Sequence, residues 1–228
     1  MRRSIILAAA IPFAIATLPV LAAAPHQPPR YHAAHSGARG DALEQVSEAT
    51  AVLARMKREP GMQRLLREAR GVLIFPDYGR AGLVVGGGGG SAVLMARNHG
   101  RWTGPALYNF GTVNIGAQAG GSGGSAAMLV MSDRALRRFE GGDRFSVNAD
   151  AGLTIVKYSA RGHAQPGDVV LWSDLKGAYA GATVGVTDLD FDEGETAALY
   201  GHRVNPRDVF SGSVHAAQAD SLIHMLPG

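Results

Sequence analysis

The sequence predicts an α+β fold in which helices at the N- and C-terminal ends flank a curled, barrel-like and mainly antiparallel β-sheet. Three observations support this prediction. Apolar residues recur at helical spacing mainly near the start and the end of residues 41–228. About eight segments with strand character lie between them. The connections between these segments are too short for the crossover helices that parallel strands require.

The first forty residues differ in character from the rest of the chain. Residues 1–24 place a basic start before an apolar stretch and a small-residue end, which is the order of a secretory signal peptide. Residues 25–40 are rich in Pro, His, Ala and Gly, and we interpret them as a disordered linker. We therefore expect an exported protein of the periplasm, either free or peripheral to a membrane, with one domain at residues 41–228. The chain has no cysteine, which excludes disulfides and a thiol nucleophile.

Local signals define the first two helices. Asp41 and Glu44 form a capping pattern at the start of an amphipathic segment. Residues 59–61, Glu-Pro-Gly, end this helix. A second helix follows from Met62, and Gly71 is placed to cap its end.

The later elements follow from similar signals. We expect a tight turn at His99-Gly100, a short helix capped by Ser132, another opened by Asn205-Pro206, and a last helix over residues 213–226. Apolar or alternating runs predict strands over the ranges 72–76, 81–85, 91–97, 105–119, 125–131, 145–158, 169–172 and 177–186.

Five consecutive glycines, at residues 86–90, separate two of these strands. A phosphate-binding loop would need a lysine after its last glycine and then a helix, but Ser91 follows directly and leads into a strand-like run. We interpret the run as a tight turn or bend between two strands. Glycines 177, 181 and 185 share one strand face, which lets another backbone or an aromatic ring approach closely.

A second glycine-rich segment formally matches the G-x-S-x-G pattern of hydrolases. Residues 120–124 place Ser122 at its centre, and histidines follow downstream. The pattern has to lie on a strand-to-helix turn, whereas residues 125–131 look like a strand. A serine hydrolase using Ser122 remains an alternative function.

Basic side chains are concentrated on the first two predicted helices. The set consists of Arg55, Lys57, Arg58, Arg64, Arg67 and Arg70. An anionic membrane attracts each nearby Lys or Arg by about 1 kcal/mol, so these residues are candidates for lipid binding. The alternative is a solvated helix face on which Arg55 and Arg64 pair with glutamates four residues later.

Several ordered motifs resemble the SYLF domain family. They are Arg70–Pro76, Ala81-Gly82 with the glycine run, Trp102 and Pro105, Gly116–Gly120, Lys176–Gly181 and Leu199–Gly201. The resemblance covers roughly residues 41–228. It implies binding rather than catalysis, since members of this family bind phosphoinositides and other anionic lipids, and its yeast members also bind actin.

The basic helices, the signal-peptide pattern and the family resemblance together predict a non-enzymatic lipid-binding module at a membrane surface of the cell envelope. We expect its ligands to be anionic phospholipid or phosphoinositide-like head groups, with no catalytic residue, metal, cofactor or nucleic acid involved. A protein–protein interaction module with a partner in the envelope is a further alternative.

Overall fold

The computed structural model describes residues 37–82, 85–115, 120–141, 154–158, 167–174, 176–177 and 188–228. The chain divides into two units, Met1–His32 and Ala33–Gly228, and all described residues belong to the second. The expected signal peptide and most of the expected linker lie outside the described residues. The linker prediction was too long at its end, because the first helix already begins at Ala38.

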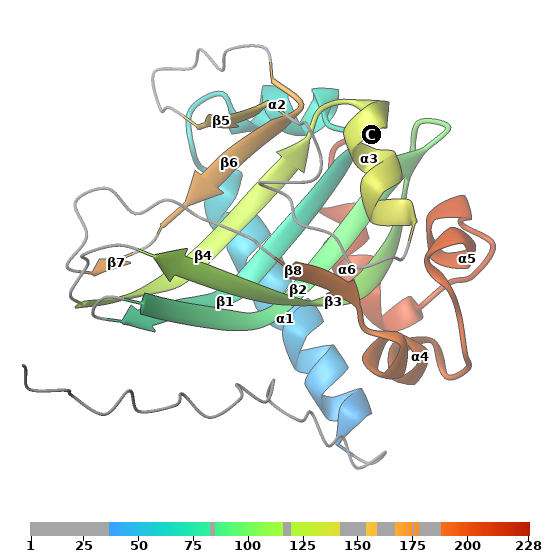
Figure 1. Cartoon of the computed structure of the whole chain (residues 1–228). Helices are drawn as coiled ribbons and strands as arrows, with labels where there is room; N and C mark the ends of the chain where they lie inside the picture. The colour runs from blue at the N-terminus through green and yellow to red at the C-terminus, as the bar shows by residue number, and fades with distance from the viewer. Residues whose placement is uncertain are drawn as a thin grey trace, which may run out of the picture. The chain divides into compact units, whose positions relative to one another are not determined.

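One curled, mainly antiparallel sheet organises the second unit (Figure 1). Its strands run in the order β5-β6-β4-β1-β2-β3-β8, and β7 pairs with β4 beside this path. Only β5 and β6 pair in parallel among the described strands. The bounds are β1 Gly71–Gly82, β2 Val85–Asn98, β3 Arg101–Ile115, β4 Gly120–Val130, β5 Ile155–Lys157, β6 Val169–Ser173, β7 Lys176–Gly177 and β8 Asp188–Phe191. The predicted fold class is confirmed.

The glycine run lies inside strand β2, so the prediction of a turn there was wrong. Gly89 pairs with Gly79 of β1 on one side and with Gly111 of β3 on the other. A Cβ atom on Gly89 would lie 2.7 Å from the carbonyl oxygen of Phe110, and one on Gly90 would lie 2.8 Å from that of Asp77. These positions therefore have no room for a side chain.

An aromatic cluster fills the space beside the bare strand. Phe110 packs edge-to-face on Phe75 with ring centroids 4.8 Å apart, and it stacks on Tyr78 at 5.4 Å. A Cβ on Gly90 would come within 3.2 Å of the Phe110 ring. The glycines thus allow large rings and neighbouring backbone to pack closely against the sheet.

Helices cover the sheet and extend from its ends (Figure 1). Helix α1, Ala38–Met56, lies across one face and buries apolar side chains that include Val46, Leu53 and Met56. Each fully buried aliphatic side chain of this kind contributes about 1.5–3 kcal/mol to folding. The other helices are α2 Met62–Glu68, α3 Asp133–Glu140, α4 Glu193–Tyr200, α5 Pro206–Ser211, η1 Ala217–Ala219 and α6 Asp220–His224.

The helix signals predicted some ends well and others poorly. Ser132 caps α3 and Asn205 caps α5, in each case by accepting a hydrogen bond from a backbone N–H three residues later. Asp41 makes no capping hydrogen bond, since α1 starts upstream of it. Gly71 is the first residue of β1 rather than a helix cap. The helix expected over residues 213–226 is shorter, and consists of the 3-10 helix η1 followed by α6.

No helix in the described ranges is long and apolar enough to cross a bilayer.

Candidate functional site

The site lies at the end of the sheet where β1 begins and β4 ends. Gly71 at the start of β1 pairs with Val130 at the end of β4. Helix α2 leads into β1 and helix α3 follows β4, so the strand pairing places these helices at the same end. Arg70 completes the link, because its Nε lies 3.3 Å from Oδ1 of Asp133 at the start of α3.

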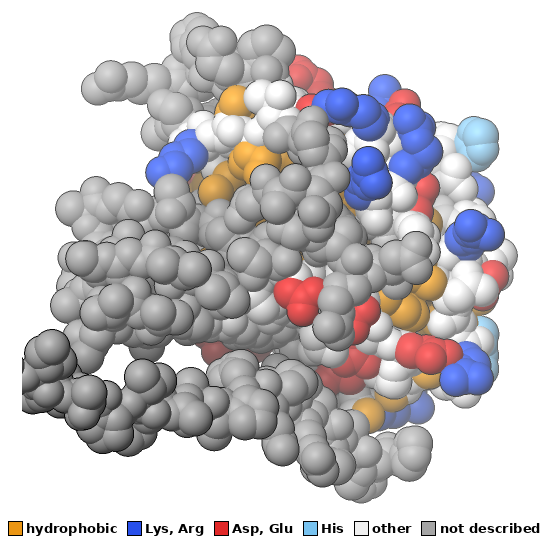
Figure 2. Space-filling model, viewed as in Figure 1, with side chains coloured by type: hydrophobic (Ala, Val, Ile, Leu, Met, Phe, Trp, Pro, Cys, Tyr) orange, Lys and Arg blue, Asp and Glu red, His pale blue; other side chains and the backbone are white. Residues whose placement is uncertain are grey.

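We call this surface the basic end, and it comprises Arg64, Arg67, Arg70, Arg134, Arg137 and Arg138. All six side chains are exposed. Figure 2 shows Lys and Arg side chains gathered over α3 at this end with some acidic side chains among them, and further acidic side chains near β8 and α4.

Two of the predicted lipid-binding residues are held in contacts within the domain. The Nε atom of Arg55 lies 3.1 Å from Oδ2 of Asp174, and its Nη2 donates to the Ser125 hydroxyl at 2.7 Å. Lys57 donates from Nζ to the carbonyl oxygen of Met225 at 2.5 Å. Arg55 and Lys57 therefore tie α1 to the sheet and to the C-terminal segment, and Arg55 does not pair with the expected glutamate.

The other four predicted residues project outward. Arg64 forms the expected pair with Glu68, at 4.0 Å. Arg58 and Arg67 are exposed and form no ion pair within the described parts of the chain. Their role in lipid binding stays a prediction. The structure places Arg70 beside the start of α3, and α2, which carries Arg64 and Arg67, at the same end of the sheet.

The cations of α3 were missed by the sequence interpretation. Arg134 pairs with Asp168 at 2.6 Å, whereas Arg137 and Arg138 are exposed and have no carboxylate partner in the described ranges. The sequence signal was present, because Arg-Ala-Leu-Arg-Arg follows the Ser132 cap closely. It was not connected with α2, since that connection depends on the pairing of β1 with β4.

Asp168 fixes the start of α3 against β5 and β6. It accepts hydrogen bonds from the Ser132 hydroxyl at 2.6 Å, from Arg134 and from the backbone N–H of Thr154 at 3.0 Å. These donors stabilise the carboxylate and lower the pKa of Asp168 to about 2, with the Ser132 hydrogen bond as the largest cause.

Arg97 joins the basic end to the last residues of the chain. Its guanidinium lies 4.7 Å from the Trp102 ring centroid, and both side chains donate to the carbonyl oxygen of Pro227, at 2.9 and 2.7 Å. Burial, followed by the nearby charge of Arg70, lowers the pKa of Arg97. The last residues are thereby held beside the same cations.

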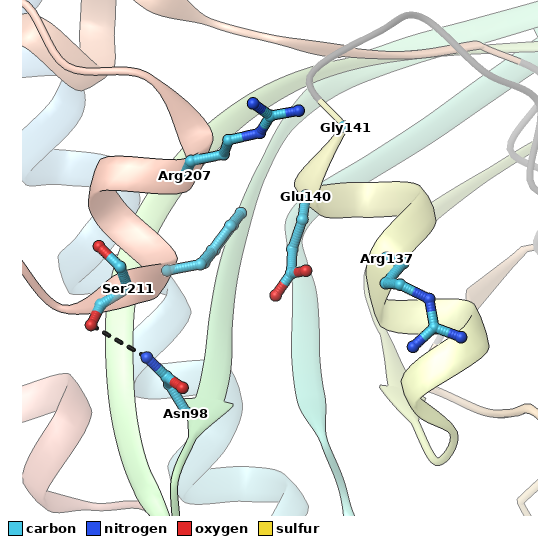
Figure 3. Close-up of a pocket in the computed structure, with 7 residues that line it drawn as sticks. Asn98, Arg137, Glu140, Gly141, Arg207 and Ser211 are labelled. Atoms are coloured by element: carbon cyan, nitrogen blue, oxygen red, sulfur yellow. Dashed lines mark hydrogen bonds between the residues drawn. The ribbon is translucent and has the colours of Figure 1, made fainter.

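A pocket of about 460 Å³ opens between α3 and α5 beside the basic end. Its lining residues are Asn98, Arg137, Glu140, Gly141, Arg207, Phe210 and Ser211. Figure 3 shows Arg207 extending from α5 toward Gly141, with the Glu140 carboxylate directed into the space between the helices. The Asn98 amide donates to the carbonyl oxygen of Ser211 at 3.0 Å and holds α5 to β2.

The hydrolase alternative lacks the backbone geometry that it needs. Residues 120–130 form one continuous strand, in which Ser122 pairs with Arg80 of β1 and Gly177 of β7. A nucleophile elbow requires a sharp turn from a strand into a helix at the serine. As for metal sites, the described ranges contain no group of three or more His, Asp or Glu side chains that could hold a metal ion.

The fold places an open, charged surface at this end of the sheet. The family model for Ysc84, described as Las17-binding protein actin regulator, matches residues 111–227, and the chain belongs to this family. This is the SYLF family that the sequence motifs resemble, and it is a family of binding domains. Comparison with curated proteins and with solved structures gave no match.

Proposed function

We propose that the chain is a non-enzymatic module that binds anionic phospholipid head groups at a membrane surface of the cell envelope, through its basic end. One observation carries the proposal. The ion pair between Arg70 and Asp133 links the segment after α2 to the start of α3, and Arg67, Arg137 and Arg138 form no salt bridge within the described residues.

The unpaired guanidinium groups suffice for a reversible contact. Each contributes about 1 kcal/mol near an anionic leaflet, so three supply about 3 kcal/mol, or roughly a hundredfold in affinity. Arg64, Arg70 and Arg134 add less, because each already has a carboxylate beside it.

The distribution of charge would orient the domain on such a surface. One group of acidic side chains lies near the start of α1 and around α4, where burial raises the pKa of Glu195 and nearby Asp192 and Asp41 raise it further. Repulsion of these carboxylates by an anionic membrane favours the orientation in which α2 and α3 face the lipid.

Export and partner identity also belong to this proposal. The signal-peptide pattern of residues 1–24 supports a periplasmic location. The family description names a Las17-binding actin regulator, so a protein partner is the alternative that the experiment has to distinguish.

Sedimentation with phosphatidylglycerol vesicles tests the proposal. Reversing two charges at the basic end, Arg67→Glu with Arg138→Glu, should lower the vesicle affinity about tenfold or more. Reversing two charges elsewhere, Arg39→Glu with Arg203→Glu, changes the net charge equally and should alter the affinity less than threefold.

Two results would refute the proposal. One is an equal loss of binding in both double variants, which would show that only net charge matters. The other is no sedimentation of the unaltered protein at low salt together with a specific envelope crosslink, which would favour a protein partner.

A further inference from the structure

The pocket between α3 and α5 carries charges of both signs. Arg137 and Glu140 come from α3, and Arg207 comes from α5. None of these three side chains forms a hydrogen bond or an ion pair inside the described portion of the chain. Figure 3 shows the Arg207 guanidinium and the Glu140 carboxylate beside the space between the helices, whereas Arg137 is directed away from Arg207. The pocket therefore presents charges of both signs to a ligand.

The walls of the pocket are fixed before any ligand arrives. The buried Tyr108 hydroxyl donates to the carbonyl oxygen of Phe139 at 2.7 Å and holds the end of α3. Thr103 donates to the carbonyl oxygen of Phe210 at 3.1 Å, and Asn98 donates to that of Ser211, so α5 is also anchored. Anchored walls reduce the entropy lost when a ligand binds.

The mixed charges exclude a purely anionic ligand as the best fit. A phosphate can accept hydrogen bonds from Arg207, but it gains nothing from Glu140 and is repelled by its carboxylate. A ligand that carries an ammonium group beside its phosphate satisfies both signs. The volume of about 460 Å³ lies in the range of small-molecule sites.

We propose that this pocket binds an aminoalkyl phosphate, with the phosphate held by Arg207 and the primary ammonium group held by Glu140. The ligand class includes the ethanolamine phosphate head group of a phospholipid and its soluble counterparts. Asn98 and Ser211 line the same space and bound the ligand on the β2 side.

The environment of Glu140 agrees with this assignment. Burial raises its pKa as the largest cause, Arg137 lowers it, and Asp133 raises it. An ammonium group bound to the carboxylate would offset the cost of this burial and bring the pKa of Glu140 down again. Its proximity to Arg137 places the two signs of charge next to each other on α3.

This inference is separate from the contact with anionic lipid, although both sites share α3. The proposed membrane contact depends on Arg67, Arg137 and Arg138, of which only Arg137 lines the pocket, and the pocket ligand is held by Arg207 and Glu140 instead. Glu140→Gln should therefore leave binding to phosphatidylglycerol vesicles unchanged. Vesicle binding without pocket binding would refute only the pocket proposal, and pocket binding without vesicle binding would refute only the membrane proposal.

Calorimetry and backbone amide NMR on the whole protein test the pocket with matched probes. Glycerophosphoethanolamine should bind about tenfold more tightly than glycerophosphoglycerol, because only the first carries an ammonium group. Inorganic phosphate should bind more weakly than either. The amide signals of Glu140, Gly141 and Ser211 should shift on binding.

Variants at the lining residues assign the roles. Glu140→Gln should bring the two glycerophosphodiesters to equal affinity, whereas Arg207→Gln should weaken both by about tenfold. Arg39→Gln, on the exposed surface of α1, is the control and should change neither, and thermal unfolding of each variant checks that it is folded.

The source of the ligand follows from a parallel measurement with vesicles. Adding phosphatidylethanolamine to phosphatidylglycerol vesicles should increase sedimentation if a lipid supplies the head group. Binding of the free probe without this increase also supports the pocket and points to a soluble ligand. Equal affinity for both probes in the unaltered protein, or signal shifts away from α3 and α5, would overturn the proposal.

Discussion

Arg55 and Arg58 are close in sequence but differ in their surroundings. The Arg55 guanidinium bridges Asp174 and the Ser125 hydroxyl, and that hydroxyl also donates to the carbonyl oxygen of Pro76 at 2.9 Å. Arg58 is exposed in the turn between α1 and α2. Sequence alone grouped them as equivalent cations, because the partners of Arg55 lie 70 and 119 residues away in the chain.

Replacing these two residues separates a structural cation from a surface one. Arg55→Ala should lower the free energy of unfolding by about 0.5–1.5 kcal/mol, since it removes the cation beside Asp174 and one donor to the Ser125 hydroxyl. Arg58→Ala should change it by less than about 0.5 kcal/mol. Urea denaturation measures both, and an equal effect would contradict the assignment.

Asp168 provides a test of electrostatics at a single residue. Its pKa is lowered from the ordinary value of 3.8 to about 2, so its contribution to stability is complete above pH 4 and is lost as the pH falls toward 2. Asp168→Asn should remove that contribution, and the free energy of unfolding should then depend less on pH between 4 and 2.

Denaturant titrations at pH 2, 3 and 4 compare the two proteins. The difference in stability should be greatest at pH 4 and should shrink toward pH 2. A difference that stays constant across this range would show that the hydrogen bonds of Asp168 do not depend on its charge.

At the scale of elements, strand β2 shows what the glycine run contributes. Glycine has a low intrinsic preference for strands, so a run of five predicts a turn from local rules. The strand forms because β1 and β3 pair with it on both sides and because Phe110 and its neighbours need the space. Such long-range pairing cannot be read from the local sequence.

A side chain in β2 should therefore disrupt the sheet. Gly89→Ala places a Cβ 2.7 Å from a backbone oxygen, which should cost about 1–3 kcal/mol of stability. Gly40→Ala is the matched control, because its Cβ would meet nothing within 4 Å and alanine is favoured in a helix. Stability no lower in Gly89→Ala than in the control would contradict the close packing described for β2.

Elements set by local signals were predicted best. The caps of α3 and α5 depend on a side chain and a backbone N–H three residues apart, so the sequence contains both partners. The break at residues 59–61 and the turn at His99-Gly100 are equally local, and both residues of that turn have positive φ. The expected strand residues 145–153 and 178–186 lie outside the described residues.

At the scale of the whole domain, only part of the site could be predicted. The cations of α2 are close together in the sequence, so the sequence alone identified them as candidates for lipid binding. The cations of α3 join them because Gly71 pairs with Val130, and the pocket forms because α5 packs near α3. The strand pairing and the helix packing both exist only in the folded chain, so the sequence did not predict them.

Helix α1 separates two regions of opposite charge. Its start lies beside α4, where Gln45 donates to Glu195, and its end leads into the turn before α2. Nineteen residues at 1.5 Å each give a length of about 28 Å, well beyond the Debye length of about 8 Å at physiological salt. A membrane can therefore attract the basic end without an equal repulsion from the acidic one.

Amide NMR with lipid bicelles tests this orientation most directly. In phosphatidylglycerol bicelles that carry a nitroxide on the head group, the amide signals of α2 and α3 should broaden most, and those of α4 should broaden least. Strongest broadening at α4, or equal broadening of all three helices, would contradict the claim that the basic end faces the membrane.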